Sequence, residues 1–82
     1  MERHYALKLD LEETMDETVA VSHLSLWGDT FEARGKAMRN PSDPSIPVIG
    51  EELAIARSLA ELSAQMLEAA QAKVSAHGRV ST

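Results

Sequence analysis

A proline-rich bend divides this chain into two halves with different residue patterns. Three prolines, Pro41, Pro44 and Pro47, lie within seven residues. Each fixes its backbone φ angle and lacks a backbone donor, so residues 40–47 are expected to form an irregular bend. No proline follows Pro47. The residues beyond the bend are apolar at three- and four-residue intervals, which predicts one long amphipathic helix over about 51–77.

Both ends of the predicted helix have sequence signals. Gly50 precedes Glu51 and Glu52, whose negative charges favour the partly positive first turn of a helix. Gly78 is a natural stop, because glycine adopts the left-handed conformation at a helix end without penalty. The apolar positions fall in two adjacent rows that together form a broad stripe, with Ile55, Leu59, Leu62, Met66 and Ala70 in one and Leu53, Ala56, Ala60, Ser63 and Leu67 in the other.

The half before the bend reads as three strands. Residues 4–11 alternate between apolar and polar side chains, which is typical of a strand with one buried face. Residues 18–27 and 30–38 are the second and third predicted strands, and the acidic run 12–17 is expected to be a solvated connection. Gly28-Asp29 is a two-residue hairpin signal between them.

That turn sets a register between the second and third strands. It pairs Ser22 with Gly35 and His23 with Arg34, and it places apolar or small residues on one face. The small residues of the third strand suit a helix that packs closely over it. We therefore predict an α+β fold as one domain, residues 1–82, in which a three-stranded antiparallel sheet is followed by one long C-terminal helix on one face.

Composition limits how such a small domain can be stabilised. The chain has 82 residues, no cysteine, three scattered histidines and a formal net charge of −5. Disulfides and thiolate metal sites are excluded, and a structural metal is not expected. The predicted helix is longer than a nine-residue strand, at about 40 Å against about 30 Å. A homodimer is therefore the expected way to complete the core. The alternative is a monomer whose helix frays beyond Ala70.

The sequence favours no catalytic function. It contains no nucleophile–base arrangement, phosphate-binding loop or paired metal ligands, so no cofactor, metal or small-molecule substrate is predicted. His23 is the one candidate general base, and a surface histidine opposite Arg34 is the favoured interpretation. With no signal peptide or membrane-length apolar stretch, we expect a cytoplasmic location and no membrane partner.

Binding has better support than catalysis. Four cations are expected on or beside one sheet face, where they would contact phosphates of RNA: Lys8, Arg34, Lys36 and Arg39. His4, His23 and Trp27 could stack on bases. The net charge opposes non-specific attraction to nucleic acid. The alternative interpretation is that this face is structural or forms a dimer interface.

The bend and the helix carry a family resemblance, which extends upstream through Gly35 and the second strand. The chain resembles a small actinobacterial family of unknown function that includes mycobacterial hypothetical proteins associated with dormancy. The resemblance implies a fold similar to a double-stranded-RNA-binding domain without its first helix, assembled as a homodimer and similar in shape to ribosome hibernation factors. Glu51 and Glu52 stand where such RNA-binding domains have lysines. The matching segments are Asn40-Pro41-Ser42-Asp43, Ile46-Pro47 and Ile49-Gly50-Glu51-Glu52-Leu53-Ala54-Ile55-Ala56-Arg57-Ser58-Leu59-Ala60-Glu61-Leu62.

Two functional hypotheses follow. The first is a non-enzymatic interaction protein that acts at the ribosome or on RNA during stress. The alternative is a protein-partner or purely structural dimeric module that binds no nucleic acid.

Overall fold

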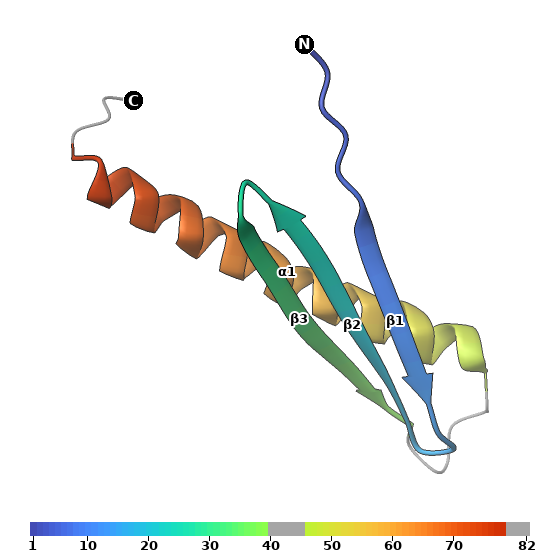
Figure 1. Ribbon diagram of the computed structural model, residues 1–82. Coiled ribbons are helices and arrows are strands. Elements are labelled where there is room, and N and C mark those ends of the chain that lie inside the picture. The colour runs from blue at the N-terminus through green and yellow to red at the C-terminus, as the bar shows by residue number, and fades with distance from the viewer. Residues whose placement is uncertain (40–45, 79–82) are drawn as a thin grey trace.

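The computed structural model describes residues 1–39 and 46–78. Three antiparallel strands form one sheet in the order β1-β2-β3, and one long helix crosses one face of it (Figure 1). The predicted α+β fold is therefore confirmed. Residues 40–45 of the predicted bend lie outside the described residues. The elements are β1 (Leu7–Glu13), β2 (Glu17–Leu26), β3 (Asp29–Met38) and α1 (Pro47–Ala76).

The β2–β3 hairpin turns one residue earlier than the sequence suggested. Its loop is Trp27-Gly28, with φ angles of 49° and 84°, and Leu26 pairs with Asp29. Two consecutive positive φ angles suit the right-handed twist of a two-residue hairpin. The predicted register is consequently wrong by two positions along β3. Ser22 faces Ala33 rather than Gly35, but a shift of two leaves every side chain on its predicted face.

The connection between β1 and β2 is shorter than predicted. β1 extends to Glu13 and β2 begins at Glu17, so only three residues of the acidic run join them. The Thr14 hydroxyl accepts hydrogen bonds from the backbone N–H groups of Asp16, at 3.3 Å, and Glu17, at 3.1 Å. A threonine side chain thus closes the turn by local bonding to the backbone.

The helix begins at Pro47, four residues before its predicted start. Proline suits the first helical turn, because the N–H that it lacks would have no partner inside the helix. The predicted role of Glu51 and Glu52 in the first turn is therefore wrong. At the other end α1 stops at Ala76, and Gly78 adopts the predicted left-handed conformation, with φ of 69°.

The helix lies very close to the sheet because the residues between them are small. A Cβ atom on Gly35 would overlap the backbone of Ala54 and Ser58 in α1, as the small residues of β3 suggested. Apart from Leu62, the buried residues among those described are all small: Thr18, Ala20, Ser22, Ala33, Gly35, Ala37, Ala54 and Ser58. Large side chains are thus excluded from the centre of the helix–sheet contact.

Within residues 1–39 and 46–78, no helix combines the length and the apolar character that a membrane span requires.

Candidate functional site

The open face of the sheet, which points away from α1, carries three of the four predicted phosphate contacts. In the cross-strand rows, Lys8 pairs with His23, and Val21 and Val19 pair with Arg34 and Lys36 respectively. Directly paired residues share a face, and the neighbouring residues of β2 and β3 are buried on the other face, against α1. Arg39 follows the end of β3, and its side chain is exposed.

Carboxylates are interleaved with these cations. The Lys8 Nζ atom lies 3.7 Å from an oxygen of Asp10, and the Lys36 Nζ atom lies 3.4 Å from an oxygen of Glu17. Exposed pairs of this kind contribute about 0–1 kcal/mol each. They nevertheless neutralise two of the four predicted cations, so the open face has mixed charge.

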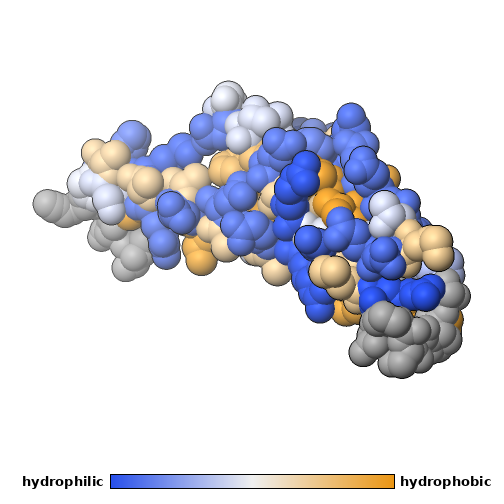
Figure 2. Space-filling view, turned by 90° about the horizontal axis from the view of Figure 1, so that it is seen from below, coloured by the Kyte–Doolittle hydropathy of each residue, from blue (hydrophilic) through white to orange (hydrophobic). Residues whose placement is uncertain are grey.

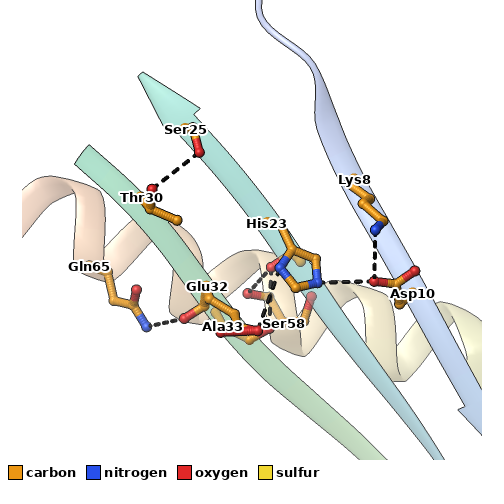
Figure 3. A network of polar contacts seen from close by, with 10 residues as sticks. Lys8, Asp10, His23, Ser25, Thr30, Glu32, Ala33, Ser58 and Gln65 are labelled. Atoms are coloured by element: carbon orange, nitrogen blue, oxygen red, sulfur yellow. Dashed lines mark hydrogen bonds and ion pairs between the residues drawn. The ribbon is translucent and has the colours of Figure 1, made fainter. Parts of the chain in front are cut away.

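His23 lies between two carboxylates at the centre of this face (Figure 3). Its Nε2 atom is 3.0 Å from Asp10 Oδ2, and its Nδ1 atom is 3.5 Å from Glu32 Oε1. The prediction that His23 stands opposite Arg34 is wrong, because the hairpin register pairs it with Glu32. The position of the β2–β3 turn determines the contact with Glu32, and the register of β1 with β2 determines the contact with Asp10.

This arrangement does not assemble a metal site or a catalytic pair. The two carboxylates contact different nitrogens on opposite sides of the imidazole ring, so a single ion cannot bind all three groups. Among the described residues, no cluster of three histidine, cysteine or acidic side chains could hold a metal ion.

A hollow of about 330 Å³ lies between the β1–β2 turn and the start of α1. It is lined by Met15, Met38 and Ile46 among others, and His23 is not part of it.

The opposite face of the sheet carries apolar side chains beside the helix that α1 does not bury completely. α1 packs on β3 and β2, and its Arg57 donates a 2.7 Å hydrogen bond to the Lys36 carbonyl on the outer edge of β3. One flank of the helix thus contacts β3, and the right-handed turn directs the other flank towards β1. We call the half-buried or exposed apolar side chains of β1 and α1 on this side of the sheet the trench: Leu7, Leu9 and Leu11 of β1, and Ile55, Leu59 and Met66 of α1.

Side chains of α1 cover the outer edge of β3 but not the outer edge of β1 among the described residues. Arg57 and Gln65 of α1 donate to backbone carbonyls of β3, at 2.7 Å and 3.0 Å. Side chains that cover an edge protect it from pairing with another chain. In the part of the chain that the structure describes, no corresponding side chain covers the outer edge of β1.

Apolar side chains are exposed elsewhere as well, and Figure 2 shows apolar surface interrupting the hydrophilic surface along the molecule. Trp27, at the tip of the β2–β3 hairpin, is 74% exposed. The guanidinium carbon of Arg3 lies 4.8 Å from the centre of its ring. The sequence did not predict the trench, because the trench depends on the sideways position of the helix over the sheet.

Comparisons with known proteins find similar sequences in mycobacteria and a similar solved structure. The chain is 33% identical over 75 residues to the "Uncharacterized protein Mb1767" of Mycobacterium bovis and to the "Uncharacterized protein MT1780" of Mycobacterium tuberculosis. In each case the match covers 92% of this chain and 74% of the relative. The crystal structure of Rv2632c superposes with a TM-score of 0.89 at 28% identity, and the match covers 99% of this chain and 96% of that chain.

A family model described as Rv2632c-like matches residues 3–81. The match includes the sheet and α1 together, and a solved structure of the same name shares the arrangement of these elements. This chain therefore belongs to the Rv2632c-like family.

Proposed function

We propose that this protein is a non-enzymatic interaction protein that acts as a homodimer in the cytoplasm. The observation that carries the proposal is the distribution of side-chain size. Apart from Leu62, the buried residues are small, whereas many large apolar side chains of β1 and α1 stay exposed. Contiguous exposed apolar surface is typical of interaction sites. A domain of this size with so thin a core gains stability from a partner.

The polar groups of the open face support binding rather than catalysis. Both ring nitrogens of His23 face carboxylates, so neither is directed at a nucleophile or a hollow that could hold a substrate. We assign these carboxylates and His23 to the stabilisation of the sheet.

The proposal is tested by the mass of the protein in solution. We expect sedimentation equilibrium to give twice the chain mass of 8.9 kDa. The second copy would bury apolar surface, and each Å² removed from water contributes about 25 cal/mol. A mass of one chain at every concentration would refute the homodimer.

Arg34 favours a second candidate function, contact with the phosphates of ribosomal RNA during stress. It lies near the middle of the open face, and no ion pair joins it to a carboxylate of the described residues. Lys36 follows it on the same face of β3 and Arg39 just beyond. Phosphate contacts of this kind position a protein on RNA and weaken steeply with salt.

Co-sedimentation with ribosomes across a salt series tests this second candidate. The double variant Arg34→Glu and Lys36→Glu should abolish a salt-sensitive interaction, because phosphates repel the new charges. The control variant Glu12→Lys lies on the same face, in the row of Val19 and Lys36, and should strengthen binding. If the native protein does not co-sediment at low salt, the ribosome is not its partner.

A further inference from the structure

The side of α1 that faces away from the sheet carries a row of apolar and small residues of its own. Its members recur at alternating intervals of four and three residues and all are exposed: Ile49, Leu53, Ala56, Ala60, Ser63, Leu67, Ala70 and Val74. We call this set the outer row. Its four large side chains are 51%, 44%, 60% and 47% exposed in chain order. Most of the row lies opposite the helix face that is buried on the sheet, whose centre is formed by Ala54, Ser58 and Leu62. At its N-terminal end, Ile49 and Leu53 also line the hollow between the β1–β2 turn and the start of α1.

This spacing is the heptad pattern of a helix that packs along another helix. An average interval of 3.5 residues keeps the same side of a helix directed at a partner over many turns. The 30 residues of α1 give a rod of about 45 Å, which Figure 1 shows extending beyond the hairpin tip. No charged residue of α1 falls in the outer row: the six are Glu51, Glu52, Arg57, Glu61, Glu68 and Lys73.

The outer row is complementary to itself when it is reversed. In an antiparallel pair with a two-fold axis between residues 60 and 63, Leu53 faces Ala70 of the partner subunit. Ala56 likewise faces Leu67 of the partner subunit. A large side chain then meets a small one, which keeps the distance between the helices uniform. A parallel pair would instead stack three successive layers of small side chains, which would leave voids.

Charge complementarity agrees with the antiparallel orientation. Glu52 and Lys73 lie on one flank of the outer row, beside the trench. Because antiparallel two-fold symmetry keeps this flank on the same side of both helices, it places Glu52 near Lys73 of the partner subunit at both ends of the pair. Lys73 is exposed and already bonds Asp29 at 2.6 Å, so both carboxylates can share its ammonium group. The same flank places Leu59 opposite Met66 of the partner subunit, which covers one wall of the trench.

We infer that a second copy of this chain packs antiparallel along the outer row of α1. The inference rests on the proposed homodimer and specifies its interface. Pairing of two β1 edges is the alternative interface, and the following experiment separates the two.

The absence of cysteine from the chain allows a clean cross-linking test. Two single variants, Leu53→Cys and Ala70→Cys, are mixed, allowed to exchange subunits and oxidised. Antiparallel packing brings residue 53 of one chain against residue 70 of the other, so the mixture should form a mixed disulfide. Two copies of residue 53 would lie about 25 Å apart along the pair, far beyond disulfide reach. Neither variant alone should therefore cross-link.

The matched control replaces Ala70→Cys by Glu68→Cys, which is exposed on the same helix but outside the outer row. Mixed with Leu53→Cys, it should give no disulfide. A dimeric mass without the mixed disulfide, or cross-linking of Leu53→Cys alone, would overturn the antiparallel interface and leave the homodimer standing. A monomeric mass at every concentration would overturn both.

Discussion

Gly35 is the residue on which the approach of helix to sheet depends most directly. A side chain there would overlap backbone atoms of α1, which cannot rotate away as a side chain can. Gly50 offers the opposite case, since a Cβ at that position would meet only the side chain of Thr18, with the hydroxyl oxygen at 2.9 Å. A side chain at residue 35 would therefore meet fixed backbone, whereas one at residue 50 would meet a side chain that can shift.

The first prediction contrasts these glycines. Gly35→Ala should lower the free energy of unfolding by about 1–3 kcal/mol, because the helix must move away from β3. Gly50→Ala should change it by less than about 1 kcal/mol, since the helix propensity gained by alanine offsets a small shift of Thr18. Urea denaturation followed by circular dichroism measures both. Equal effects of the two substitutions would contradict the close contact at Gly35.

The backbone of Trp27 is strained, because its φ angle is positive, and a residue that tolerates positive φ would relieve the strain. Its φ of 49° is a conformation that costs a non-glycine residue about 1–2 kcal/mol, and most of its ring is exposed. Trp27→Asn would create an Asn-Gly turn, which favours two successive positive φ angles. We expect the variant to unfold at a higher temperature than the native protein. A lower unfolding temperature would show that the contact of Arg3 with the ring stabilises the hairpin more than the strain destabilises it.

At the scale of elements, the sequence predicted the order of strands and helix and the face of each strand, but not their relative positions. The alternation in β1 and the small residues of β3 determine which side meets α1. The register was missed because nothing in Trp27 signals a positive φ, so Gly28-Asp29 was the stronger turn signal. The contact of His23 with Glu32 was missed for the same reason, and its contact with Asp10 was missed because the sequence set no register between β1 and β2. The trench was missed because a hydrophobic pattern does not encode which strands a helix covers.

The outer row gives a prediction at this scale. Leu67→Glu would place a carboxylate against Ala56 of the partner subunit, where it loses water and has no charge partner. We expect the dissociation constant of the dimer to rise about tenfold or more, which corresponds to about 1.4 kcal/mol. At protein concentrations above the raised dissociation constant, the far-ultraviolet circular dichroism should keep its helical signal, because residue 67 is exposed and lies outside the face of α1 that is buried on the sheet.

Ser75→Glu is the control for that variant, since it adds the same charge to an exposed residue outside the row. Sedimentation equilibrium should show a dissociation constant close to the native value. If both variants dissociate the dimer equally, the effect is one of net charge and the outer row is not the interface.

At the scale of the whole molecule, one chain is long and thin. Its extents are 54 × 24 × 17 Å and its radius of gyration is 16.6 Å, whereas a compact domain of this length would have about 12 Å. Such a shape exposes much surface for the core that it encloses, which agrees with the small size of the buried residues. Two chains packed along α1 would make a thicker body with a shared apolar layer.

The concentration dependence of thermal unfolding tests the central claim, that a second copy completes this fold. When only the dimer is stably folded, mass action raises the unfolding temperature as protein concentration increases. We predict a clear rise of the unfolding temperature across a hundredfold range of protein concentration. For scale, a partner present at one hundred times its dissociation constant stabilises the folded chain by about 2.7 kcal/mol. An unfolding temperature that is the same at every concentration would show that one chain is stable alone, and would contradict the account.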